Sequence, residues 1–441
     1  MWGSHWTMAM EKRGIPGVFI VDEPFKADVQ ITCAKEGMSA LRRIVVPHPC
    51  GDVDDNQLPG FLDQLVDALT RPLTAEERHP VPKKAESVQR LAFRGTLDEI
   101  DLFFNRRGWS DGLPLVPPTE RAVMAMLTGT MHSPDEVVSD NMYPESLTVT
   151  VEKVATVGVM AGCKPEYMPV LLAIIEAMNA EWYSSTVRST SSFSMAILVN
   201  GPMAAKIGMN AGINALGSGT GNKANATIGR FLRLALICLG GARTGVSDLS
   251  SIGNPSKYSF AFAENEEASP WEPYHVSAGY GADESVVTLM TGGWSCVAPF
   301  AQMQDDIELA LDTMSRAIAR FELPNGALFV MDPMVARKLA AAGHAKLAVE
   351  ERLWAKATKT AAEFRQDHFY IPFILPVLKG KSWYGKTAQW PASYLDVPPE
   401  QEIPIFPKGA VRIVVVGGAT NPFTQAWQLG RPSSAVVAKW V

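Results

Sequence analysis

A short polar segment carries the densest group of side chains suited to acid–base chemistry. It follows the apolar run 258–263 and combines acids with an amine, a phenol and an imidazole. Ligands of open α/β sheets bind beyond the carboxyl ends of strands, and this set has the ingredients of general acid–base catalysis. A solvated turn is the alternative for the acids. The candidate catalytic residues are Lys257, Tyr258, Glu264, Glu266, Glu267 and His275.

A glycine-rich loop at 217–223 leads into an apolar helix predicted at 227–239. Glycines let successive N–H groups point into one concavity, and a helix start adds free donors and the positive end of its dipole. The spacing is not that of a Walker loop, and no strand directly precedes it, as a dinucleotide fingerprint requires. A turn needed only for packing is the alternative. The expected ligands of a small anion are Gly217, Gly219, Gly221, Asn222, Lys223 and Arg243.

Two cysteines and one histidine are further candidates for chemistry. Cys163 precedes a helix that begins at Pro165, and a helix start beside a lysine lowers the pKa of a thiol. Cys296 follows the strand predicted at 284–290, where an active-site loop is expected; for both thiols a small buried hydrophobe is the alternative. His48 lies between two prolines and is either a rigid catalytic group or a turn residue. No ligand spacing such as HExxH occurs, so we assign no metal, and the cofactor stays open.

Composition excludes several classes of protein. The net charge is −6 and the basic residues are scattered, which argues against nucleic acid as a partner. No apolar run of membrane-spanning length and no leader peptide is visible, so we expect no membrane contact. Five cysteines without a CxxC pair, in a chain too large to need disulfides, indicate the cytoplasm.

The order of elements predicts an α/β fold. Strands at 17–21 and 43–46 alternate with helices, which is typical of parallel α/β units. We predict a small Rossmann-like or flavodoxin-like unit over 1–70 that lacks its first strand, a proline-rich linker over 71–87, and a larger mixed α/β domain over 88–441. Its sheet is expected to be mixed or parallel, with strands at 194–200, 284–290, 327–331 and 411–416.

The N-terminal pattern resembles the UGSC family of (seleno)proteins. The resemblance rests on Glu11–Pro16, Glu23-Pro24-Phe25 and Val46-Pro47-His48-Pro49 with Gly51; the later segments 329–343 and 414–419 resemble longer members. In that family a selenocysteine or cysteine, Gly, Ser and Cys form a redox-like box before such a helix. The box falls here at Trp2-Gly3-Ser4-His5, which keeps Gly and Ser and replaces both chalcogen positions. The resemblance therefore transfers no catalytic residue.

These features favour an enzyme that acts on a small anionic organic metabolite by redox or lyase chemistry. The degenerate box and the missing first strand leave a second hypothesis open, a noncatalytic or half-site subunit whose partner carries the intact box. A small-ligand sensor is the third. We expect a homo-oligomer or a hetero-oligomer, with a homologous chain as one partner.

Overall fold

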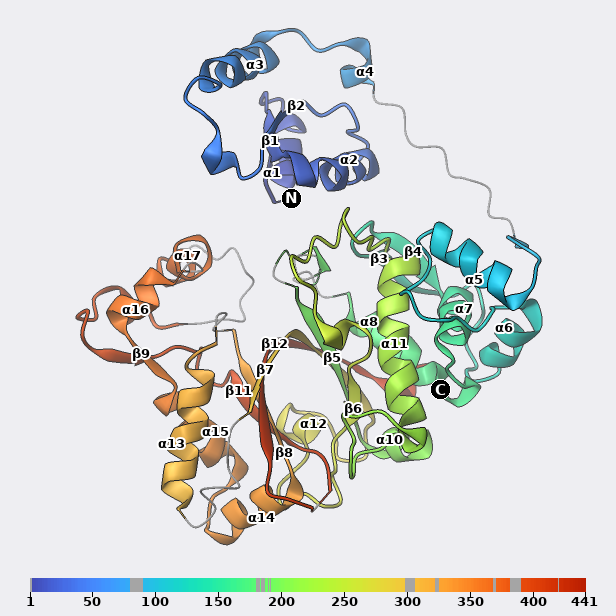
Figure 1. Cartoon of the computed structure of the whole chain (residues 1–441), viewed down its shortest axis with the longest axis vertical. Helices are drawn as coiled ribbons and strands as arrows, with labels where there is room; N and C mark the ends of the chain where they lie inside the picture. Colours follow the sequence, from blue (N-terminus) through green and yellow to red (C-terminus); the bar gives the residue numbers. More distant parts are fainter. Residues whose placement is uncertain are drawn as a thin grey trace.

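The computed structural model is a mixed α/β protein, as predicted (Figure 1). It describes residues 2–79, 90–179, 183, 187, 188, 190, 192–297, 306–321, 325–367, 370–380, 390–418 and 420–441.

The N-terminal unit is built around a parallel strand–helix–strand crossover. Strands β1 (Phe19–Asp22) and β2 (Arg43–Val46) pair in parallel through helix α2 (Lys26–Lys35), and α1 (Trp2–Glu11) packs beside them. Parallel neighbours need such a crossover because a tight turn cannot connect them. The core of the unit is small: Met8, Val21, Val29, Cys33 and Leu41. With two paired strands, the unit is of the α/β class, as predicted. Two strands do not distinguish a Rossmann-like or flavodoxin-like topology from other α/β folds.

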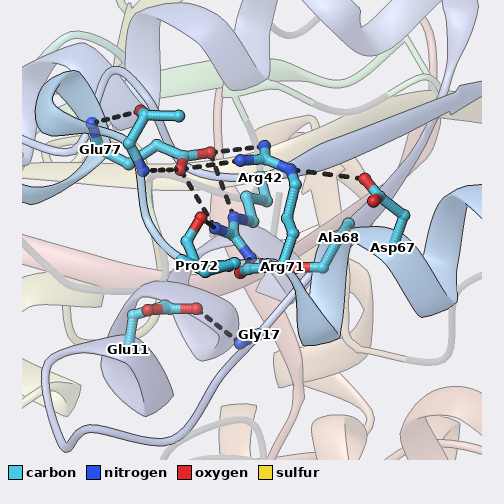
Figure 2. A network of polar contacts seen from close by, with 9 residues as sticks. Glu11, Gly17, Arg42, Asp67, Ala68, Arg71, Pro72 and Glu77 are labelled. Atoms are coloured by element: carbon cyan, nitrogen blue, oxygen red, sulfur yellow. Dashed lines mark hydrogen bonds and ion pairs between the residues drawn. The ribbon is translucent and has the colours of Figure 1, made fainter.

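A buried arginine ties the following helices, α3 (Leu58–Thr70) and α4 (Ala75–Arg78), to this unit (Figure 2). Arg42 donates to the carbonyls of Ala68, Arg71 and Pro72 and to the Glu77 carboxylate at 3.1 Å. The hydrogen bonds from Arg42 and then Arg71 hold the pKa of Glu77 far below its usual value. The first residues of the predicted linker, 71–78, therefore pack against the N-terminal unit.

Six strands form one mixed sheet in the order β11-β8-β12-β7-β5-β6. The pairs β5/β6 and β8/β11 are parallel, whereas β12 and β7 are antiparallel to each of their neighbours. The predicted strands at 194–200 and 327–331 are confirmed, and β12 was not predicted. The bounds are β5 Ser194–Asn200, β6 Ala261–Ala263, β7 Val286–Val297, β8 Ala327–Met331, β11 Val411–Val415 and β12 Thr424–Val436.

The sheet curls, and its two faces have different partners. Ile197 and Val199 of β5 pack in a core with the helices α7 (Val151–Ala161), α8 (Met168–Ala177) and α11 (Lys223–Cys238). Strands β8 and β11 pack their outer face on α13 (Ile307–Ile318), α14 (Pro333–Ala341) and α15 (Lys346–Lys356). Alternate residues, such as Leu198, Phe262 and Val414, meet in a third core. Because side chains alternate along a strand, this third core is the inner face of the curl.

The two edge strands of the curled sheet approach each other at their carboxyl ends. The amide of Asn265, just after β6, donates to the carbonyl of Val415 in β11 at 2.7 Å. The Asn265 side chain also donates to the Gly417 carbonyl at 2.9 Å. Contacts between residues about 150 positions apart thus close one end of the curl.

Short elements complete the described structure. The remaining helices and strands are α5 Leu97–Arg106, α6 Glu120–Leu127, β3 Val137–Met142, β4 Leu147–Thr150, α10 Pro202–Lys206, α12 Tyr274–Ser277, β9 Thr358–Thr360, α16 Ala361–Gln366, α17 Leu375–Leu378 and β10 Glu402–Pro404. The 3-10 segments include η1 Glu23–Phe25, η2 Cys50–Asp52 and η9 Val437–Trp440.

One buried arginine connects the two parts of the chain. Arg188 lies 3.4 Å from the Asp28 carboxylate and donates to the Thr32 hydroxyl at 3.1 Å, both on α2. It also donates to the Pro144 carbonyl, between β3 and β4. Burial raises the pKa of Asp28, which the charge of Arg188 opposes. The N-terminal unit therefore contacts the larger unit through α2.

Candidate functional site

Helix α11 forms a crossover between the parallel strands β5 and β6, and its direction follows from its contacts. Near the start of the helix, the Ala226 carbonyl accepts from the Ser259 hydroxyl at 3.0 Å, close to β6. Further along, Arg233 lies 3.0 Å from the carboxylate of Asp248, which also binds Lys257. The helix therefore runs antiparallel to β6, and its N-terminus faces the carboxyl edge of the sheet, where α/β proteins bind ligands (Figure 1).

At this edge one amide side chain binds two carboxylates. The register pairs Val199 with Ala263, so Asn200 and Glu264 come next on the inner face. Asn200 Nδ2 donates to Glu264 Oε2 at 2.7 Å and to Glu266 Oε1 at 3.0 Å. Because Asn200 donates to both carboxylates, Glu264 and Glu266 lie close together at the carboxyl edge of β5 and β6.

Glu264 is held on every side. Its Oε2 also accepts from the backbone amide of Tyr274 at 2.7 Å, and it is buried under α12. Burial raises the pKa of Glu264, and the charge of Lys346 opposes that rise. A carboxylate so enclosed is suited to positioning its neighbours.

Glu266 is better placed for contact with a ligand. Its Oε1 accepts from the Gly201 amide at 2.7 Å and lies 3.9 Å from His275 Nδ1. Its side chain keeps 29% of its surface exposed, whereas His275 is fully buried. Within the described residues, His275 Nδ1 and Asn200 Oδ1 are buried without a hydrogen-bond partner. Buried polar atoms without a partner are costly and call for an explanation, of which a catalytic role is one.

The glycine loop is held in shape by asparagine side chains. The buried Asn222 donates to the carbonyls of Asn214 at 2.6 Å and Gly217 at 2.7 Å, and it accepts from Asn210 at 2.7 Å. A side chain at Gly217 would collide with Asn214, so packing explains that glycine. The polar atoms of Asn222 therefore serve the loop rather than a ligand.

The remaining loop residues are open to solvent. Gly219, Gly221 and Lys223 are exposed, and Lys223 is the first residue of α11. The Gly417 amide donates to the Ala211 carbonyl at 2.8 Å. Because Gly417 also binds Asn265, the residues before the loop and the residues after β6 meet at the same edge.

Lys257 and Tyr258 lie away from this edge. The Lys257 ammonium binds both oxygens of Asp248 at 2.9 Å, before β6 begins. With Arg233 and Met195 it lines a small cleft at the amino end of β5. Burial lowers the pKa of Lys257, and its hydrogen bond with Asp248 opposes this. Tyr258 is exposed. The structure does not bring these two residues to the Glu266 carboxylate.

Arg243 and Lys223 are separated by a whole helix. Arg243 follows the C-terminus of α11, a helix of 16 residues, which corresponds to about 24 Å. Its guanidinium is largely exposed and lies 3.8 Å from Glu145. One small anion therefore cannot contact both Lys223 and Arg243.

Glu267, the third predicted acid, is exposed on the turn after β6.

The two candidate cysteines differ in what the structure describes. The Cys163 thiol donates to the Thr227 carbonyl at 3.4 Å, and burial raises its pKa to about 12. This shift is opposite to the lowering that the nearby helix start predicts. Cys296 lies in β7, and its side chain is outside the described part of the structure.

Asn200 is the site residue that sequence reasoning missed. A strand was predicted to end at this position, and a polar residue at the carboxyl end of a buried strand was the available signal. Within the described residues, no group of three His, Cys, Asp or Glu side chains is arranged to hold a metal ion. Within those residues, none of the helices has both the length and the apolar character needed to cross a bilayer.

The segment in which the resemblance places the box, Trp2 to His5, lies in the first turn of α1. Gly3 packs directly on the Phe19 ring, which leaves no room for a side chain, and Ser4 is fully buried. Both residues therefore contribute to the packing of the N-terminal unit.

Comparison with known proteins places only the N-terminal part of the chain. No curated protein and no solved structure matches the sequence. The model of the UGSC family matches residues 4–75, well under half of the chain. This match confirms the resemblance where the β1–α2–β2 crossover lies, and the N-terminal unit is UGSC-like.

Proposed function

We propose that the protein is an enzyme that acts on a small anionic organic molecule at the carboxyl edge of β5 and β6. The observation that carries the proposal is the convergence of two features at this edge. The N-terminus of α11, with Lys223, faces it, and the Glu266–His275 pair lies at the ends of the two strands. A cation and a helix start attract an anionic group, and a carboxylate beside it can accept a proton.

In this proposal each residue has one task. Lys223 and the exposed N–H groups of the loop bind the anionic group of the substrate, and Glu266 removes a proton from the adjacent carbon. The electron pair of that C–H bond forms a double bond as a leaving group departs, which is lyase chemistry. Glu264 and Asn200 fix the orientation of Glu266. The Lys257 cleft is a weaker candidate because Asp248 already neutralises its ammonium.

A binding and exchange experiment tests this assignment. The full chain is titrated calorimetrically with malate, citrate and 3-phosphoglycerate, and proton exchange from bound probe into D₂O is followed by NMR. Lys223→Ala should weaken binding about tenfold or more, because a hydrogen bond to a charged group contributes about 1.5–3 kcal/mol. Glu266→Gln should keep binding and stop the exchange.

The matched control for charge is Lys356→Ala, an exposed lysine at the end of α15. It should bind the probes as the unaltered protein does. Equal affinity of the Lys223→Ala variant, or unchanged exchange in the Glu266→Gln variant, would contradict the proposal.

A half-site subunit is a second candidate, favoured by one face of α3. None of its residues is buried, and Leu58, Leu62, Val66 and Leu69 are between 40% and 59% exposed. These residues recur at helical spacing, so they form one apolar stripe. Exposed apolar patches mark interaction sites. We propose that a homologous chain with the intact box covers this stripe.

Two further observations support proposals about the fold of the N-terminal unit and the cellular compartment of the protein. The β1–α2–β2 crossover supports a Rossmann-like or flavodoxin-like unit, since parallel crossovers build such sheets. The described cysteines Cys33, Cys50, Cys163 and Cys238 are free thiols. Free thiols support a cytoplasmic location.

A further inference from the structure

The N-terminal unit has its own polar pair at the carboxyl edge of its two parallel strands. Asp22 is the last residue of β1, and it is paired with Val46, the last residue of β2. His48 follows two residues later, and its Nδ1 lies 2.9 Å from Asp22 Oδ2. Neither residue belongs to the site at β5 and β6.

The imidazole of His48 is oriented from several sides. The Phe25 ring meets it edge-on, with centroids 6.0 Å apart and planes at 75°. Pro47 and Pro49 restrict the backbone on both sides of it. Asp22 has no proton to donate when ionised, so the hydrogen bond assigns the proton to Nδ1 and leaves a lone pair on Nε2. The His48 side chain is 50% exposed and can receive a solvent-borne molecule.

One helix begins at this edge. Helix α2 starts directly after η1, which follows Asp22, and it has 10 residues. Helix starts present free N–H donors, which complement the negative charge that develops when an imidazole removes a proton from a nucleophile.

We propose that Asp22 and His48 form a general-base pair in a second catalytic site, which acts on a small substrate with an electrophilic carbonyl carbon. Nε2 accepts a proton from water as the water oxygen bonds to that carbon. The bond to the leaving oxygen then breaks, and the imidazolium returns the proton to that oxygen. The step needs no oxidant, no metal and no thiol. His48 is the catalytic residue, and Asp22 is a positioning residue.

Ester hydrolysis and NMR together test the proposal on the full chain. With p-nitrophenyl acetate as the probe, His48→Asn should lower the rate at least about tenfold, because general bases contribute about 10²–10⁴-fold. His48→Gly should regain hydrolysis when free imidazole is added. Asp22→Asn should lower the rate while ¹⁵N NMR of the imidazole shows loss of the Nδ1–H tautomer.

The matched control is His79→Asn, an exposed histidine of the same unit. It should keep the rate of the unaltered chain, and circular dichroism should show that all variants are folded. Equal rates for His48→Asn and His79→Asn would overturn the proposal, as would an Nε2–H tautomer in the unaltered protein. Loss of hydrolysis in Cys50→Ser with retention in His48→Asn would also overturn it. None of these outcomes depends on Lys223 or Glu266.

Discussion

Asn200 is the residue on which the geometry of the acidic site depends most. Its amide donates to both Glu264 and Glu266. Burial raises the pKa of Glu264 above its usual 4.5. A group with a raised pKa contributes stability that is fully present below its unfolded pKa and lost as pH rises through the folded one. Removing a donor to the charged form raises that pKa further.

We therefore expect Asn200→Ala to destabilise the fold by about 1–3 kcal/mol at pH 8 and by less at pH 5. Urea unfolding at both pH values measures the difference. Asn210→Ala, which removes an amide from the glycine loop, should show no comparable pH dependence. A loss from Asn200→Ala that is equal at the two pH values would contradict the assigned coupling.

At the residue scale, the sequence predicted correctly which site residues lie together when they are close in the chain, but not when their neighbours come from distant segments. Glu264, Glu266 and His275 are close in the chain, and the end of one strand holds them together. Lys257 was assigned to the same group, but Asp248 binds its ammonium at the opposite, amino end of β6. Spacing along the chain does not predict that Lys257 forms an ion pair with Asp248, because the position of Asp248 depends on how α11 packs.

Helix α11 illustrates how packing overrides propensity at the scale of an element. Gly229 faces the sheet, and a Cβ there would lie 2.7 Å from the Phe260 backbone nitrogen. Alanine is favoured over glycine in helices by about 1 kcal/mol. Forcing the helix away from β6 costs about 1–3 kcal/mol, so this steric cost is expected to exceed the gain in helix propensity.

Gly229→Ala should therefore destabilise the protein in urea unfolding. Gly60→Ala in α3 is the matched control, because nothing lies within 4 Å of its added Cβ. That change should stabilise by about 0.4–1 kcal/mol. A stabilised Gly229→Ala variant would show that α11 does not press on β6 as described.

Strand β5 was predictable residue for residue because Met195–Val199 is an unbroken apolar run and the whole strand is buried. Strand β12 was not, because Gly430, Arg431 and Pro432 interrupt it and its pairing register shifts between Gly430 and Ser433. A strand that contains turn-forming residues is recognised only from the strands with which it pairs in the structure.

At the scale of the whole molecule, the apolar stripe of α3 makes a prediction about assembly. Leu62→Asp combined with Val66→Asp should release the partner chain, since two charges would enter an apolar contact. Native mass spectrometry of protein purified from its source measures the assembly. Gln64→Asp, an exposed position on the same helix, should leave it intact. Unaltered protein that is a single chain at micromolar concentration would rule out the paired subunit.

The position of β12 has a consequence for how the protein is made. It lies between β7 and β8, although it follows every other strand in the chain. During synthesis, β5, β6 and β7 can pair before β8 and β11 are made, but no strand pairs with the open edges of β7 and β8 until residues 424–436 leave the ribosome. From the synthesis of β8 until that of β12, the nascent chain carries two open strand edges, a state that invites aggregation and the attention of chaperones.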